Sequence, residues 1–204
     1  MPILNVPSEV EIELTHKCNW DCRYCAIRTH SLPAISEDEA LEKVEAAAGK
    51  FQTVTFSGGE PGMLSKEILE RMIKTVEDSG SALCINTNGT FIRKYSDMVG
   101  RFDEVIYHCS RDLDDPLLIY KQFNNIRYML VVDDVNYPRL KYYLDDNPGV
   151  IFDVVPASYE PGDSRKQLSV FYKMEIVRKF GDRITLDSKH RLFVDKDFDA
   201  VKYL

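Results

Sequence analysis

A parallel α/β fold is predicted for this 204-residue sequence because β-rich apolar runs alternate with helical patterns from one end to the other. The runs are dense in Val, Ile, Phe and Tyr, which suits strands buried on both faces. Six successive β-then-α units imply parallel strands joined by right-handed crossovers. Such a sheet is either an open doubly wound sheet or a curved partial barrel, and periodicity alone leaves both open.

The predicted strands are short apolar runs, each bounded by turn or helix signals. They cover residues 10–14, 53–57, 82–86, 104–109, 127–132 and 150–155.

Helical patterns fill the gaps between the strands. Ser36 followed by Glu39 forms a capping-box pattern ahead of an apolar stripe. Apolar residues repeat at helical spacing over 68–76, and Gly80 is well placed to end that helix. Further helices are expected over 93–99, 116–123, 138–144 and 166–180, and a hairpin over 183–195.

The chain reads as one domain over residues 1–204, with a core of about 8–180 and a C-terminal extension over 181–204. No apolar stretch approaches the roughly 20 residues needed to cross a bilayer, and no signal-peptide pattern opens the sequence. A cytoplasmic protein with no membrane partner is therefore expected. The formal charge of −7 argues against a broad nucleic-acid surface, since phosphate backbones attract basic patches.

Three of the five cysteines, Cys18, Cys22 and Cys25, form a C-x3-C-x2-C pattern directly after the first predicted strand. Thiolates at these spacings can converge from one loop onto a single iron–sulfur cluster. Three ligands for four irons leave one iron open, and an open coordination position is typical of reactive metal sites. An odd cysteine count with three packed so closely does not resemble a disulfide framework.

Other readings of the cysteine pattern remain at this point. A zinc site would need a fourth ligand, which His16, His30 or a distant cysteine could supply. A thioredoxin-like motif would use Cys22 and Cys25 and leave Cys18 unexplained. Cys84 and Cys109 lie within predicted strands, where a small buried hydrophobe is the better interpretation.

The second predicted strand ends in Ser-Gly-Gly-Glu-Pro, residues 57–61. Two glycines at the carboxyl end of a strand allow a ligand to approach the backbone, whose polar groups can then bind it. A tight strand-to-helix turn with a solvated glutamate would explain this motif alone. Its position one strand after the cysteine loop favours a binding site.

Together these motifs resemble the radical S-adenosylmethionine (SAM) superfamily, over about residues 11–156. The resemblance implies a partial (β/α)6 barrel. It also implies a [4Fe–4S] cluster on Cys18, Cys22 and Cys25, with SAM bound at the open iron. The resulting enzyme would reductively cleave SAM, and the 5′-deoxyadenosyl radical would abstract a hydrogen atom from a substrate. An electron donor of the flavodoxin or ferredoxin type is the expected partner.

The same resemblance assigns SAM contacts. Tyr24 would lie beside the adenine, while Gly58, Gly59 and Glu60 would receive the methionyl amino group. Asn86, at the end of the third strand, stands where other members carry an acidic residue that contacts the ribose hydroxyls; an amide can make those bonds too. Asn88 is the next candidate for the ribose contact, together with Ser110, which follows the fourth strand.

The sequence gives fewer signals for the substrate than for the cofactors. A compact core with Gly-Gly-Glu-Pro and Thr-Asn-Gly-Thr is similar to 7-carboxy-7-deazaguanine synthases, although their glycine- and glutamate-rich lead-in is missing. A small nucleotide or nucleobase-type substrate is therefore predicted. An activase that places a glycyl radical on a partner protein is the alternative enzyme, and an iron–sulfur or zinc module without catalysis is the alternative outside enzymes. Polar side chains expected at the mouth of the sheet are Arg28, His30, Arg111, Asp112, Asp133 and Ser158.

Overall fold

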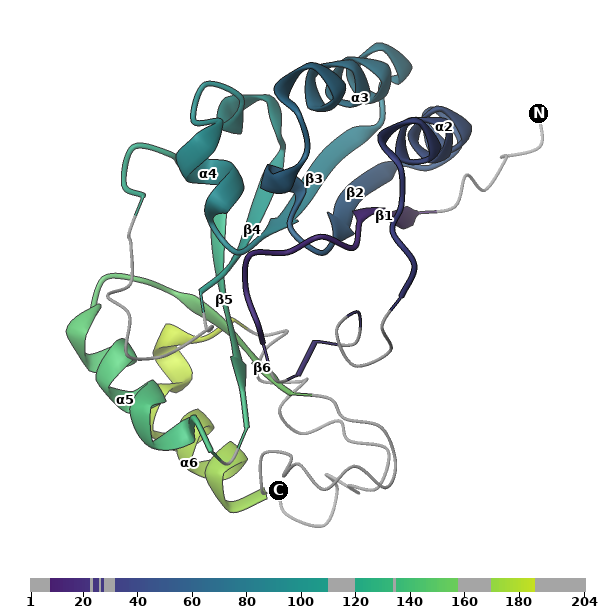
Figure 1. Cartoon of the computed structure of the whole chain (residues 1–204). Coiled ribbons are helices and arrows are strands. Elements are labelled where there is room, and N and C mark those ends of the chain that lie inside the picture. The colour runs from purple at the N-terminus through teal and green to yellow at the C-terminus, as the bar shows by residue number, and fades with distance from the viewer. Residues whose placement is uncertain are drawn as a thin grey trace. The chain divides into compact units, whose positions relative to one another are not determined.

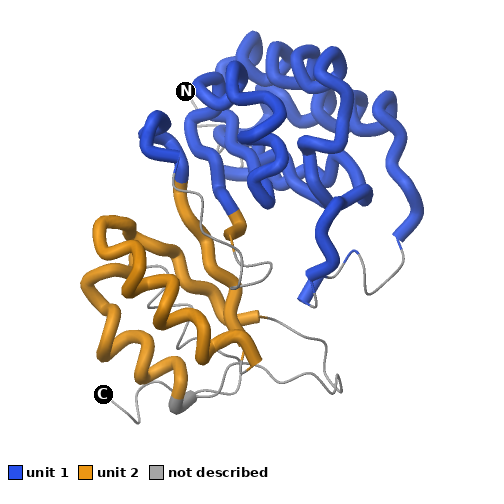
Figure 2. Tube along the Cα trace, turned by 60° about the vertical axis from the view of Figure 1, so that its left-hand side comes forward, with its two compact units in different colours: residues 1–107, 120–126 blue, residues 108–119, 127–204 orange. Residues whose placement is uncertain are grey.

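The computed structural model describes residues 8–22, 24, 25, 27, 32–109, 120–133, 135–157 and 170–185. The chain divides into two compact units, coloured separately in Figure 2. Unit 1 comprises residues 1–107 and 120–126, and unit 2 comprises residues 108–119 and 127–204. Among the described residues, no helix is both long and apolar enough to cross a membrane.

Six strands form the sheet in the order β1-β2-β3-β4-β5-β6. The pairs β1–β2, β2–β3, β3–β4 and β5–β6 are parallel, as the alternation of strands and helices predicts. Each predicted strand is found within two residues of its expected ends. Their bounds are Glu9–Thr15, Thr53–Gly58, Ala82–Thr87, Glu104–His108, Ile126–Val132 and Phe152–Pro156.

Helices α2 (Glu37–Ala47) and α3 (Lys66–Ser79) run side by side along one face of β1–β3 (Figure 1). The Ser36 hydroxyl accepts a hydrogen bond from Glu39 N (3.1 Å), which confirms the predicted N-cap. Gly80 ends α3 in the left-handed conformation, as predicted. The apolar stripe of α3 is buried, and the helix packs against β3 and α2.

The end of unit 1 differs from the sequence prediction. Helix α4 (Thr90–Lys94) begins three residues after the end of β3, and the 3₁₀ turn η2 (Val99–Arg101) stands where the predicted helix over 93–99 would end; a further 3₁₀ turn, η1 (Pro61–Met63), follows β2. The helix predicted over 93–99 is therefore wrong in its start and its length. Phe91 is the physical reason, because its ring packs edge-on against Phe102 (5.3 Å between centroids) and draws this segment into the core.

Unit 2 contains β5, β6, helix α5 (Tyr137–Asp146), helix α6 (Val170–Phe180) and the turn η3 (Gly181–Arg183). Helix α5 confirms the helix predicted over 138–144. Helix α6 confirms the described part of the helix predicted over 166–180. Of the helix predicted over 116–123, residues 120–123 are described and form a turn. The predicted hairpin lies mostly outside the described residues, and Ile184 instead forms a parallel bridge with Phe152.

Candidate functional site

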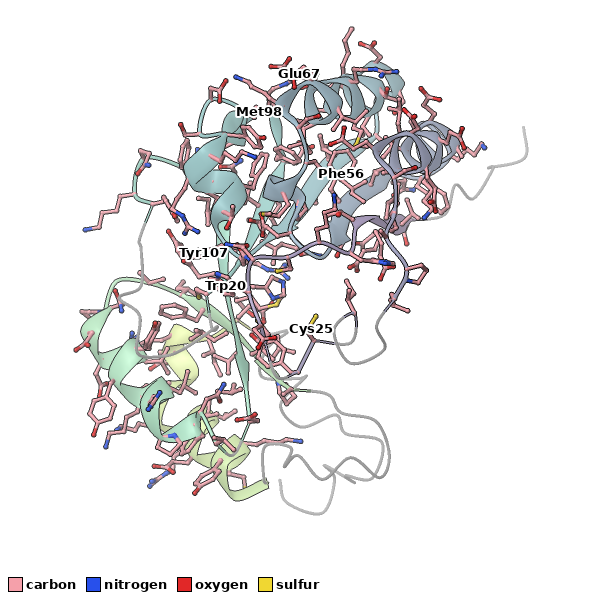
Figure 3. The ribbon with its side chains drawn as sticks, viewed as in Figure 1. Trp20, Cys25, Phe56, Glu67, Met98 and Tyr107 are labelled. Carbon is pink, nitrogen blue, oxygen red and sulfur yellow. The ribbon has the colours of Figure 1, made fainter. Side chains whose placement is uncertain are left out.

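The cysteine loop, residues 16–25, leaves the carboxyl end of β1 and carries Cys18, Cys22 and Cys25. Figure 3 shows Trp20 and Cys25 on this segment. A tight turn closes between Cys25 N and Cys22 O (3.1 Å), and Trp20 N donates to the Cys18 thiol sulfur (3.3 Å). The three cysteines are not disulfide-bonded to one another, and Cys18 is exposed. Three thiols are therefore carried on one loop that starts from the carboxyl end of β1.

The donor chemistry of the cysteine loop fits an iron–sulfur cluster. Thiolates are the ligands that such clusters prefer, and Cys18 already accepts N–H hydrogen bonds of the kind that stabilise a thiolate. Although the residue as a whole is exposed, partial burial of its sulfur raises the pKa of the Cys18 thiol, and the Trp20 hydrogen bond lowers this pKa. Within the described residues, no three His, Cys, Asp or Glu side chains are arranged to hold a metal ion.

The Gly-Gly-Glu turn, residues 58–60, lies directly against the start of the cysteine loop. Gly59 N donates to the carbonyl oxygen of Thr15, and Glu60 N donates to that of Lys17 (2.8 Å). These two bonds continue the β1–β2 pairing past the end of the sheet. The loop that carries Cys18 and the turn that follows β2 are thus one hydrogen-bonded unit.

The two glycines of this turn are required by the close approach of backbone to backbone. Gly58 has a φ of +108°, a conformation that side chains rarely adopt. A Cβ added at Gly59 would overlap the carbonyl of Lys17, and a Cβ at Gly58 would overlap that of Thr15. The packing of the cysteine loop is therefore one reason for glycine here, beside the ligand approach expected from the sequence.

The Glu60 side chain is fully buried, with 0% of its surface exposed. Its oxygens accept hydrogen bonds from Gly62 N (2.9 Å), Phe91 N (3.0 Å), Asn88 N (2.7 Å) and the Thr87 hydroxyl (2.9 Å). A carboxylate has about four lone-pair sites, so these four donors occupy its capacity. Burial raises the pKa of Glu60, while the four hydrogen bonds lower it. The carboxylate thus ties the Gly-Gly-Glu turn to the segment that follows β3.

Asn86 lies on β3 with its amide nitrogen near two oxygen atoms. It is 3.3 Å from the Ser57 hydroxyl on β2 and 3.4 Å from a carboxylate oxygen of Glu11 on β1. Three neighbouring strands therefore contribute one polar side chain each to this point. The sequence prediction singled out Asn86 alone. Glu11 was missed because an exposed glutamate on an edge strand resembles an ordinary surface residue.

Asn88 contacts the cysteine loop. Its Oδ1 accepts from Thr90 N (3.0 Å), which directs its Nδ2 toward Asn19 Oδ1 (3.0 Å) and the sulfur of Cys18 (3.6 Å). Asn19 in turn donates to the Thr90 hydroxyl (3.1 Å). The side chain of Asn88 is buried and fully oriented, and the group it faces is a predicted cluster ligand.

The structure also describes the histidine, the two further cysteines and the tyrosine that the sequence analysis considered. The ring nitrogens of His16 contact Pro33 O and Glu13 Oε2, so both are already engaged. The thiol of buried Cys109 donates to Met129 O (3.2 Å), as expected of a structural cysteine. Burial raises the pKa of the Cys84 thiol to about 11, which keeps it protonated. Tyr24 is half-buried on the cysteine loop.

The predicted substrate contacts lie mostly beyond the described part of the chain. Buried Asp133 is described, and its carboxylate accepts from Val135 N and Asn136 N (2.9 Å each), which stabilises the turn before α5. The substrate candidates outside the described residues are Arg28, His30, Arg111, Asp112 and Ser158, and the predicted SAM contact Ser110 also lies outside them.

Comparison with known proteins places this site in a family. The model of the Radical SAM superfamily matches residues 12–116, the stretch that holds both motifs and the end of β3. An S-adenosylmethionine-dependent nucleotide dehydratase of Lacinutrix mariniflava is 36% identical in a 96-residue alignment that covers 43% of this chain and 20% of that protein. A protein of Methanocaldococcus jannaschii whose name proposes glycyl-radical enzyme activation is 31% identical over 94 residues, 45% of this chain and 36% of that protein. The matches thus span about a third or less of these relatives' lengths.

Solved structures share the fold at low sequence identity. One of anSMEcpe with bound AdoMet and a peptide superposes with a TM-score of 0.65 at 14% identity, over 86% of this chain and 59% of that chain. One of Streptococcus suis SuiB bound to S-adenosylmethionine gives a TM-score of 0.60 at 16% identity, over 87% and 48%. HemN from Escherichia coli gives a TM-score of 0.53 at 12% identity, over 87% of this chain and 52% of that chain. These likenesses confirm the predicted partial-barrel fold class.

Proposed function

The chain belongs to the radical SAM superfamily, whose members bind a [4Fe–4S] cluster and SAM, and we propose that it acts as follows. Cys18, Cys22 and Cys25 hold the cluster, SAM is cleaved reductively, and hydrogen is abstracted from a small nucleotide or nucleobase-type substrate. When bound, the cluster supplies the electron that breaks the sulfonium–C5′ bond of SAM and so generates the 5′-deoxyadenosyl radical.

One observation carries this proposal: the hydrogen-bonded pairing of the cysteine loop with the Gly-Gly-Glu turn. The bonds Gly59 N to Thr15 O and Glu60 N to Lys17 O bring a three-thiol segment and a glycine turn to the same strand ends. A structural zinc site would need four protein ligands, and the ring nitrogens of His16 are already engaged. A three-thiol site beside a backbone turn suits a metal that keeps an open position for SAM.

The chain's own residues bind and orient SAM in this proposal. Backbone groups of Gly58 and Gly59 meet the methionyl group, because the carboxylate of Glu60 is already occupied. Asn86 and the adjacent carboxylate of Glu11 meet the ribose hydroxyls, which can donate to both. Tyr24 lies beside the adenine, and Ser110 is a further polar contact. Such positioning restricts a reactive primary radical to one neighbouring C–H bond.

The substrate class is supported by the nucleotide dehydratase relative, which is 36% identical over 96 residues. A flavodoxin- or ferredoxin-type protein is the proposed electron donor. The second candidate is activation of a glycyl-radical partner protein, which the Methanocaldococcus jannaschii relative favours. The two differ in whether the hydrogen donor is a small molecule or a polypeptide backbone.

The test uses the anaerobically reconstituted full chain with SAM and dithionite. Formation of 5′-deoxyadenosine, measured by mass spectrometry, supports SAM cleavage, and its absence from a fully loaded protein contradicts it. Adding a panel of nucleotides should raise the yield with at least one of them, with transfer of substrate deuterium into 5′-deoxyadenosine. Transfer only from a co-purified protein that then shows a glycyl-radical EPR signal would favour the activase.

A further inference from the structure

The most heavily hydrogen-bonded polar group of the described site is Glu60, whose side chain is engaged by donors from the protein itself. Its carboxylate has no exposed surface and accepts four protein donors, three of which come from residues 87–91. A ligand that needed this carboxylate would have to displace one of those donors, which would leave a buried N–H or O–H without a partner. The side chain is therefore occupied in holding the segment that follows β3.

Asn88 is the residue that this segment delivers. Its backbone N–H donates to Glu60 Oε2 at 2.7 Å, the shortest of the four bonds. Its side-chain oxygen is held by Thr90 N, so its amide N–H group can only face Asn19 and the sulfur of Cys18. A continuous path thus runs from the Gly-Gly-Glu turn through Glu60 and Asn88 to a cluster ligand.

We propose that Glu60 and Asn88 are positioning residues that set the electronic environment of the cluster through the N–H···S hydrogen bond to Cys18. This inference rests on the proposed function, because it requires a cluster on the three cysteines. Hydrogen bonds to ligand sulfurs are among the factors that determine cluster potential. An N–H dipole stabilises the extra negative charge of the reduced cluster, so this bond raises the reduction potential. Glu60 acts by fixing the backbone from which the Asn88 amide is aimed.

The experiment is an EPR-monitored redox titration of the reconstituted full chain. In Asn88→Ala the midpoint potential should fall while iron content stays at the parent level. Asn88→Asp keeps the acceptor for Thr90 N but replaces the donor with a negative charge, so its potential should fall further. Asn147→Asp is the matched control, since that amide donates to Tyr143 O in unit 2, and its potential should equal the parent's.

A second measurement, hydrogen exchange of backbone amides, tests the role of Glu60 independently of cluster assembly. In the cluster-free protein, Glu60→Gln places an N–H₂ group against N–H donors, so the amides of Asn88 and Phe91 should exchange with solvent about tenfold faster or more. Glu77→Gln, which alters an exposed pair with Arg101, should leave those amides unchanged. If the parent protein assembles no cluster, the proposed function fails. If it assembles one and the Asn88 variants keep the parent potential, or the two amides exchange at the parent rate, the inference is overturned.

Discussion

The cysteine loop and the Gly-Gly-Glu turn lie side by side but are organised by different forces. Glu60 is wholly buried with four hydrogen-bond donors, whereas Cys18 is exposed and its thiol is held by two N–H contacts. The turn is complete without any ligand. The three thiols, by contrast, are not arranged around a common metal position in the described residues. The Gly-Gly-Glu turn is thus fixed by the protein's own buried hydrogen bonds, whereas Cys18 at the start of the cysteine loop is not held by burial.

The largest expected effect is loss of the cluster. Cys18→Ala, Cys22→Ala or Cys25→Ala should each abolish the binding of about four irons and four sulfides per chain. Because Cys18 is exposed, its substitution should leave the free energy of unfolding of the metal-free protein within about 0.5 kcal/mol of the parent. Cys84→Ala and Cys109→Ala are the controls and should retain iron. Stoichiometric zinc without iron–sulfur absorption in the parent would contradict the expectation.

Glu60→Ala is expected to lower the stability of the metal-free protein, in contrast to Cys18→Ala, because it leaves four donors in the interior without their acceptor. The free energy of unfolding of the metal-free protein should fall by about 3–5 kcal/mol, measured by urea denaturation. Glu77→Ala removes an exposed ion pair and should cost less than about 1 kcal/mol. Equal stability of the two variants would show that the buried hydrogen bonds of Glu60 do not stabilise the Gly-Gly-Glu turn.

Gly59→Ala probes the contact between the cysteine loop and the Gly-Gly-Glu turn. Its Cβ would overlap the carbonyl of Lys17, one residue before Cys18, so the backbone must shift at a cost of about 1–3 kcal/mol. We expect weaker SAM affinity and also incomplete iron loading, both measured on the reconstituted protein. Gly100→Ala, where an added Cβ meets nothing within 4 Å, should change neither. Full iron loading in Gly59→Ala would show that iron binding does not depend on the contact between the cysteine loop and the Gly-Gly-Glu turn.

The smallest effect is expected at the ribose contact. Asn86→Leu should reduce SAM affinity about ten- to a hundredfold by removing a polar partner, with the cluster intact. Asn86→Asp would place a second carboxylate beside Glu11, and like charges this close oppose one another. The double variant Asn86→Asp with Glu11→Gln should therefore bind SAM better than Asn86→Asp alone. Parent-like affinity in all three variants, measured by equilibrium binding, would move the ribose contact elsewhere.

Local sequence patterns predicted most of the elements. Apolar strand runs, the Ser36 cap and the Gly80 stop depend on neighbours a few residues away, so they can be recognised without the fold. The start of α4 could not be recognised in this way. It depends on Phe91 entering the core against Phe102, a contact between residues that no local periodicity links.

The chemistry proposed for the site follows from the sequence alone, because thiol spacing and the order of the motifs predict which groups can meet at the strand ends. The tertiary structure decided which of those groups are still free to bind. Glu60 and the Thr87–Phe91 segment are about 30 residues apart in the chain, yet their hydrogen bonds occupy the glutamate completely. A polar side chain is satisfied by its neighbours in space, so its role as ligand or support is settled only when the strands come together.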